Sequence, residues 1–137
     1  GLVKRAEKIF HNDSPLSEDP FFKSKVAQIE LDLSALEMTE LRGLAAEREG
    51  KGPGAESSLL KIKGTELQQR LTSLALEAAG HEALPFGGPY GFKDQEVSSS
   101  KAAQLTAAKY LNFRKVTIYG GTNEIQKNII AKAVLGL

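Results

Sequence analysis

Apolar residues recur at helical spacing in two long segments of the chain. In the first segment they follow one another at steps of mostly three and four residues, through Phe22, Val26, Ile29, Leu33 and Leu36 and on to Leu41 and Leu44. Such spacing places one apolar stripe along a long helix that begins near Phe21. A second helix is predicted from Glu56 to Ala79. Its expected buried face consists of Leu60, Leu67, Leu71, Leu74 and Ala78.

The segments around these two helices are rich in helix-breaking residues. Gly50–Gly54 contains a proline between glycines, so it predicts a tight turn and an antiparallel helix pair. Leu2–Phe10 reads as the end of a basic helix, which the Asn, Asp, Ser and Pro residues of His11–Pro20 interrupt. Gly80–Ser100, with several Gly and Pro residues, predicts a surface loop of about twenty residues, a length that is often functional.

Two shorter helices are predicted after that loop. Ser98–Ser100 offers N-caps for a helix that runs to about Leu111, and a break at Tyr119–Thr122 leads into a final helix. The apolar face of the final helix is expected to carry Ile125, Ile129, Ala133 and Leu137. No segment shows the alternation typical of strands. The pattern therefore predicts an all-α fold, an up-and-down four-helix bundle in a single domain.

Composition and charge narrow the classes of partner. The 137 residues include 18 Lys and Arg against 17 Asp and Glu, so no net field favours nucleic acid or a membrane surface. The absence of Cys excludes disulfides and thiolate chemistry and suits a reducing compartment. No apolar run approaches the roughly 20 residues that span a bilayer. We expect a cytoplasmic protein. Because the sequence begins at Gly1, within an apparent helix, we expect that it starts inside a longer parent.

The stretch Ile118–Leu137, IYGGTNEIQKNIIAKAVLGL, carries the strongest functional signal. Gly120 and Gly121 leave room for a ligand or another backbone just before a helix. Either Thr122 or Asn123, the latter with Gln126 three residues on, can cap that helix. Both choices leave free amides at its positive end, which favours anionic or electron-rich groups such as a phosphorylated or conjugated cofactor. An ordinary glycine turn between two helices is the alternative.

The order of residues in this stretch resembles the C-terminal signature of acyl-CoA dehydrogenases. The resemblance covers nearly the whole chain, because the order of two long helices, a Gly-rich loop and two shorter helices is similar to the C-terminal bundle of that family. It identifies residues 1–137 as the C-terminal helical domain of a flavoprotein. The N-terminal helical and middle β domains of the family are then absent from this sequence.

The resemblance implies a reaction and a set of site residues. The family removes an α-proton from an acyl-CoA with a carboxylate base, while a hydride leaves the β-carbon for FAD, and 2-enoyl-CoA is formed. Tyr119 and Gly121 match positions that line the acyl pocket and approach the thioester. Contacts to FAD are implied for Thr122, Asn123 and Glu124, and a further FAD contact for Gly80 through a second, less complete motif. The base of many members falls at Gly120, so this chain is expected to contain no catalytic base.

The resemblance also implies partners and leaves an alternative. The expected partners are the acyl-CoA substrate, an electron-transfer flavoprotein or similar acceptor, and further subunits of a homo- or hetero-oligomeric dimer or tetramer. Because Gly120 replaces the base, a non-catalytic helical assembly subunit is the second hypothesis, and an unrelated four-helix protein is a third. No metal is expected, since His11 and His81 have no ligand partners at suitable spacing. Three loop aromatics, Phe86, Tyr90 and Phe92, are interpreted as anchors of the loop.

Overall fold

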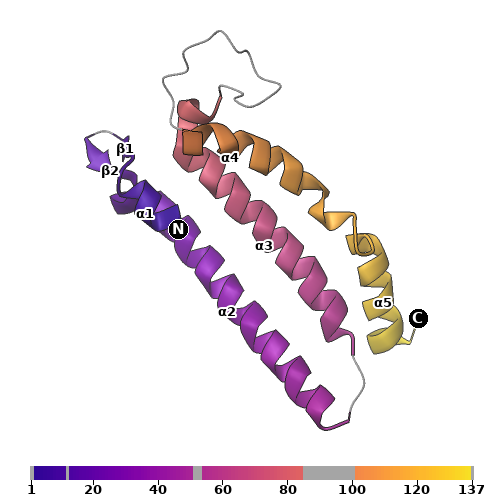
Figure 1. Cartoon of the computed structure of the whole chain (residues 1–137). Coiled ribbons are helices and arrows are strands. Elements are labelled where there is room, and N and C mark those ends of the chain that lie inside the picture. The colour runs from indigo at the N-terminus through magenta and orange to yellow at the C-terminus, as the bar shows by residue number, and fades with distance from the viewer. Residues whose placement is uncertain (1, 12, 51–53, 85–100, 137) are drawn as a thin grey trace. The chain divides into compact units, whose positions relative to one another are not determined.

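The chain is all-α, as predicted. A computed structural model describes residues 2–11, 13–50, 54–84 and 101–136. Its main elements are α1 (Leu2–Ala6), α2 (Pro20–Arg48), α3 (Glu56–Ala79), α4 (Lys101–Asn112) and α5 (Asn123–Leu135), labelled in Figure 1. Short 3-10 turns are η1 (Leu16–Glu18), η2 (Gly80–Ala83) and η3 (Phe113–Thr117). The predicted bounds of α3 agree with the observed ones at both ends.

A very short strand pair separates α1 from α2. β1 (Phe10–His11) and β2 (Ser14–Pro15) pair antiparallel, with Phe10 opposite Pro15. Asp13 lies between them with φ +63°, a left-handed conformation that Asp tolerates in turns. The sequence gives no sign of this pair, because two-residue strands are too short to produce an alternating pattern. The opening helix consequently ends at Ala6 rather than near Phe10.

The long helix α2 begins with a local cap. The Asp19 carboxylate accepts a hydrogen bond from the backbone N–H of Phe22 at 2.7 Å, and Pro20 follows as the first helical residue. This order satisfies a free amide at the helix start and places Pro where no amide is needed. At the other end Gly50 takes φ +78° after the last turn. Most of the predicted Gly50–Gly54 turn, residues 51–53, lies outside the described residues.

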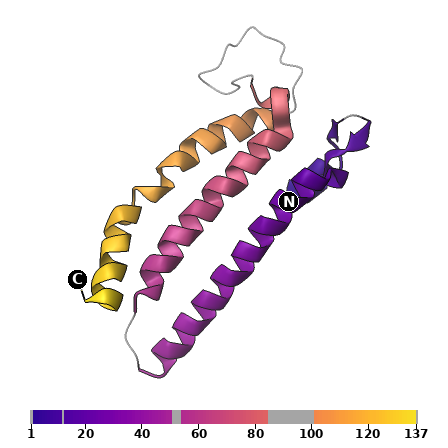
Figure 2. The same cartoon turned by 180° about the vertical axis from the view of Figure 1, so that it is seen from behind.

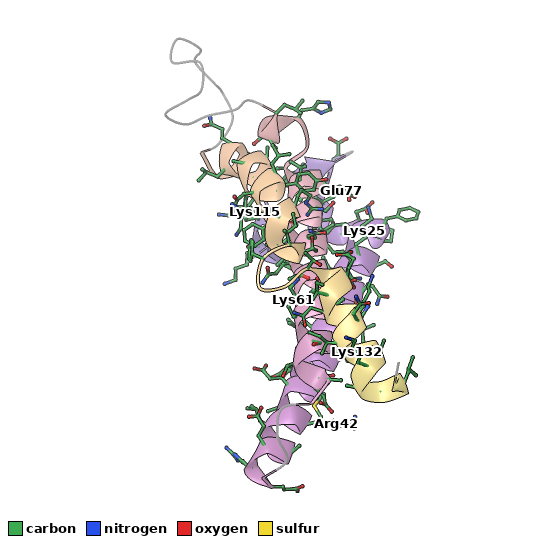
Figure 3. The ribbon with its side chains drawn as sticks, turned by 90° about the vertical axis from the view of Figure 1, so that its right-hand side faces the viewer. Lys25, Arg42, Lys61, Glu77, Lys115 and Lys132 are labelled. Atoms are coloured by element: carbon green, nitrogen blue, oxygen red, sulfur yellow. The ribbon has the colours of Figure 1, made fainter. Side chains whose placement is uncertain are left out.

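The chain divides into two compact units. The first comprises Gly1–Ala27 and Gln69–Arg114. In it, Lys25 near the start of α2 forms an ion pair with Glu77 near the end of α3, seen in Figure 3. Figure 1 shows these two helix segments running in opposite directions. The core of this unit is formed by Ala6, Phe22, Leu74, Ala78, Ala83 and Ala103.

The second unit comprises Gln28–Gln68 and Lys115–Leu137. Its buried apolar residues are Ile62, Leu67 and Val116. Gly64 on α3 lies close to α2, since a Cβ at Gly64 would lie 3.8 Å from a methyl carbon of Leu36. The same ribbon seen from behind in Figure 2 shows α5 following η3 at the end of the chain.

Part of the predicted core is exposed. Leu71 is 44% exposed, whereas Thr72 next to it is buried, so α3 is rotated slightly from the predicted face. On α2 the far part of the stripe is open, including Leu33, Leu41 and Leu44. The final helix likewise exposes Ile125, Ile129 and Ala133, and Leu137 lies outside the described residues. The apolar faces of α2 and α5 are thus only partly covered by the described chain.

Two further expectations concern the region after α3. The predicted loop from Gly80 begins with η2, and residues 85–100, including Phe86, Tyr90, Phe92 and the capping serines, lie outside the described residues. The helix expected after those serines is α4. No helix in the described part of the chain has the length and apolar character needed to cross a membrane.

Candidate functional site

The predicted site residues Tyr119–Glu124 form a turn that joins η3 to α5 in the second unit. Gly120 has φ +69° and Gly121 has φ +83°. Two successive left-handed residues are costly for any residue with a Cβ and readily adopted by glycine. The Gly-Gly pair is therefore required by the backbone path of the turn.

Thr122 is the N-cap of α5. Its extended backbone (φ −61°, ψ 157°) places the side-chain oxygen to accept a hydrogen bond from the backbone N–H of Ile125 at 3.3 Å. Of the two caps that the sequence allows, Thr122 is thus the one used.

Gln126 reaches back over the same turn. Its Nε2 donates to the carbonyl oxygen of Gly120 at 3.1 Å. A Cβ built on Gly121 would lie only 2.7 Å from that Nε2, whereas a Cβ on Gly120 meets nothing within 4 Å. The side chain of Gln126 therefore closes the turn on the side of Gly121 and leaves the side of Gly120 open.

Asn123 faces inward. Its side chain is buried, and its Oδ1 accepts a hydrogen bond from Lys61 Nζ on α3 at 2.7 Å. The hydroxyl of Thr65 donates to the same oxygen at 3.4 Å. The side-chain oxygen of Asn123 thus joins α5 to α3 inside the second unit and is occupied there by these two donors.

Glu124 lies exposed in the first turn of α5. The pKa of its carboxyl is lowered, first by a hydrogen bond from its own backbone N–H, then by the Thr122 hydroxyl, and to a smaller extent by Lys127 and Lys61. The ionised carboxylate therefore occupies the electropositive helix end that the sequence suggested for a phosphorylated group. What it offers to a ligand is a strong acceptor for hydroxyl or N–H donors.

The remaining site residues are less constrained. Tyr119 is 57% exposed at the start of the turn. Gly80 follows α3 in the first unit, has φ +53° and has open space where a Cβ would stand, as is typical of a glycine that ends a helix. The residues from Tyr119 to Glu124 therefore lie together in the second unit, whereas Gly80 lies in the first unit.

Lys61 was missed by the sequence reasoning. Besides Asn123, its ammonium donates to the carbonyl oxygen of Thr117 at 3.0 Å. A signal existed, because polar residues recur along one side of α3 at steps of three and four: Ser58, Lys61, Thr65, Gln69 and Thr72. In the first unit, two of these polar residues bind Arg114 in η3. Gln69 donates a hydrogen bond to the Arg114 carbonyl oxygen, and the Arg114 guanidinium donates to the Thr72 hydroxyl.

One open hollow of about 530 Å³ lies in the first unit. Its apolar floor includes Leu71 and Ala75, and its rim carries Lys4, Arg5, Glu7, Lys8 and Lys109, with Leu2 completing the lining. Every polar residue around it is exposed. The hollow therefore lacks the buried polar group that marks a built binding site. Within the described residues no group of three His, Cys, Asp or Glu side chains is placed to hold a metal.

The fold and the turn can now be compared with known proteins. Residues 2–135 match the family described as acyl-CoA dehydrogenase, C-terminal domain. The chain is 29% identical over 124 residues to acyl-CoA dehydrogenase IpdE1 of Mycobacterium tuberculosis, covering 88% of the chain and 28% of the relative. It is 28% identical over 121 residues to IpdE1 of Mycolicibacterium smegmatis, covering 88% and 26%.

A solved structure shares the fold. In the crystal structure of the ChsE4-ChsE5 complex from Mycobacterium tuberculosis, one chain superposes with a TM-score of 0.73 at 21% identity, covering 99% of this chain and 33% of that one. The chain thus spans between a quarter and a third of the relatives that it matches.

Proposed function

Because this chain belongs to the acyl-CoA dehydrogenase family through its C-terminal domain, we propose that it acts as that domain in a flavoprotein acyl-CoA dehydrogenase. The complete protein would add the N-terminal helical and middle β domains of the family. Its reaction would be the α,β-dehydrogenation of an acyl-CoA thioester to 2-enoyl-CoA. This proposal extends from the matched domain to the whole protein, since the chain spans only part of the matched relatives.

The turn before α5 is the observation that carries the proposal. It combines two left-handed glycines, an exposed Tyr119 and an ionised, exposed Glu124 at one helix end. This set of groups suits FAD, because the ribityl and ribose hydroxyls of FAD can donate hydrogen bonds to a carboxylate such as that of Glu124. Thr122, Asn123 and Glu124 would hold the cofactor. When bound, FAD would supply the hydride acceptor.

The residues of this chain would bind and orient rather than abstract the proton. The backbone at Gly121 would approach the thioester on the side that Gln126 leaves open, and Tyr119 would line the acyl pocket. Gly120 can remove no proton, so the carboxylate base would be supplied by another part of the protein. Removal of the α-proton to that base and departure of the β-hydrogen as hydride balance the formation of the C=C bond.

The proposal predicts a direct spectroscopic result. The intact protein, purified with FAD and mixed anaerobically with a series of acyl-CoA thioesters, is expected to lose its oxidised-flavin absorbance with at least one of them. Stoichiometric production of 2-enoyl-CoA should accompany the loss. An intact protein that holds FAD and is not reduced by any acyl-CoA would contradict the enzymatic role.

A second function is favoured by Gly120 and by the open apolar face of α5. A helical assembly subunit without its own base would pair with an active chain, and the solved relative is itself named as a complex of two components. Such a subunit would form part of an oligomer core through exposed residues such as Ile125 and Ile129. The same anaerobic experiment separates the two functions, because reduction would then require addition of a second, different chain.

A further inference from the structure

One ammonium group holds both ends of the turn before α5. Lys61 Nζ donates to the carbonyl oxygen of Thr117, just before the turn, and to Oδ1 of Asn123, just after it. The two distances are 3.0 Å and 2.7 Å, and all three residues lie in the second unit. Figure 3 shows Lys61 on α3 beside the start of α5. The five residues between these two anchors include the glycine pair and the helix cap.

The hydrogen bonds of Lys61 differ in kind from the contacts of Lys25 and Lys63. Lys25 and Lys63 form ion pairs with carboxylates at exposed positions. Lys61 is half-buried and donates to two neutral oxygens, the Thr117 carbonyl and the Asn123 amide. Hydrogen bonds from a charged donor are about twice as strong as neutral ones, and burial reduces the competition from water. An ammonium group that binds both ends of the turn therefore lies directly behind it.

We propose that Lys61 is a positioning residue for the candidate site, which fixes the turn so that the Gly121 backbone, Thr122 and Glu124 are presented together to a ligand. The identity of that ligand as FAD rests on the proposed function, whereas the fixing of the turn does not. The charge also serves the site, since the ammonium is one of the groups that lower the pKa of the Glu124 carboxyl. Turn geometry and carboxylate charge are thus both linked to one side chain of α3.

Hydrogen exchange tests the fixing of the turn. In the intact protein, Lys61→Met keeps the length of the side chain and removes its donors. We expect the hydrogen-bonded backbone amides at the two ends of the turn, those of Ile118, Ile125 and Gln126, to exchange at least about tenfold faster, the factor that corresponds to the loss of one charge-assisted hydrogen bond. Lys25→Met is the matched control, because it removes an exposed ion pair in the other unit and should leave these amides unchanged. Unchanged exchange in Lys61→Met would overturn the proposal.

Ligand binding separates positioning from a general structural role. In the intact protein with FAD, the Kd for FAD should rise at least about tenfold in Lys61→Met, recover largely in Lys61→Arg and stay unchanged in Lys25→Met. A wild-type protein that binds no FAD would contradict the proposed function, and the exchange result would still decide the role of Lys61. Equal Kd values for wild type and Lys61→Met would overturn the positioning role alone.

A second variant covers a failure to fold. Asn123→Leu removes the acceptor and keeps a similar volume, so it should accelerate the same amides even if Lys61→Met unfolds. In the double variant, Asn123→Leu should add little to the effect of Lys61→Met if both substitutions act through one contact. Independent effects of the two substitutions would show that Lys61 does not act on the turn through Asn123.

Discussion

Substitution of Gly121 by Ala tests the geometry of the turn quantitatively. Gly121 has φ +83°, and a non-glycine residue in the left-handed region costs about 1–2 kcal/mol. The new Cβ would also lie 2.7 Å from Gln126 Nε2, so the flexible end of that side chain must move away and release the Gly120 carbonyl. Loss of this exposed hydrogen bond adds about 0.5–1 kcal/mol. We therefore expect Gly121→Ala to lower the free energy of unfolding by about 1.5–3 kcal/mol.

Two matched substitutions isolate the contribution of Gln126. Gly120→Ala carries a similar backbone cost at φ +69° but meets nothing within 4 Å, so it should cost only about 1–2 kcal/mol. In a Gln126→Ala background, Gly121→Ala should lose its extra cost and match Gly120→Ala. Urea unfolding of the four variants gives the values. Equal costs of Gly121→Ala with and without Gln126 would refute the closing contact described for this side chain.

Three further predictions concern charge, pocket shape and assembly. Because the pKa of Glu124 is lowered in the folded state, its ionised form stabilises the fold above the ordinary Glu pKa of about 4.3, and this contribution disappears as the pH falls through the lower folded value. Glu124→Gln should therefore flatten the fall of the urea midpoint between about pH 6 and about pH 3, and an unchanged pH profile would contradict the assigned hydrogen bonds. Gly120→Glu in the intact protein should reduce turnover of branched acyl-CoA relative to linear acyl-CoA, because the open space beside Gly120 would be filled; equal relative turnover would rule this out. The 137-residue chain alone should bind FAD poorly, since the proposed site needs the β domain, and its recovery with stoichiometric flavin would be the opposite result.

The elements that the sequence predicts well are those with strong local signals. The bounds of α3 follow from its apolar period, the preceding Gly-Pro turn and the following Gly80. The start of α2 follows from Asp19 and Pro20, which satisfy the helix end locally. Each of these features depends on residues within a few positions of one another. Local chemistry was therefore sufficient for most of the all-α fold.

The parts that were not predictable depend on residues distant in sequence. Thr122 and Asn123 are both good caps, but Thr122 caps α5, and the Asn123 side chain instead binds Lys61, which is distant in sequence. The exposure of Ile125 and Ile129 depends on what covers α5, which no local pattern encodes. The position of Leu71 was predicted wrongly because Thr72 takes the buried side of α3 through its contact with Arg114. The sequence pattern identifies which face of a helix is apolar or polar, and tertiary contacts decide whether that face is buried.

The claim that the turn before α5 contacts FAD is tested most directly by cofactor affinity. FAD titration of the intact apoprotein should give a Kd at least about tenfold higher for Glu124→Ala than for wild type, since a hydrogen bond to a charged acceptor is lost. The control Glu37→Ala removes an exposed carboxylate of α2 and should leave the Kd unchanged. Equal FAD affinity in Glu124→Ala, Glu37→Ala and wild type would contradict the assignment of this turn as the cofactor site.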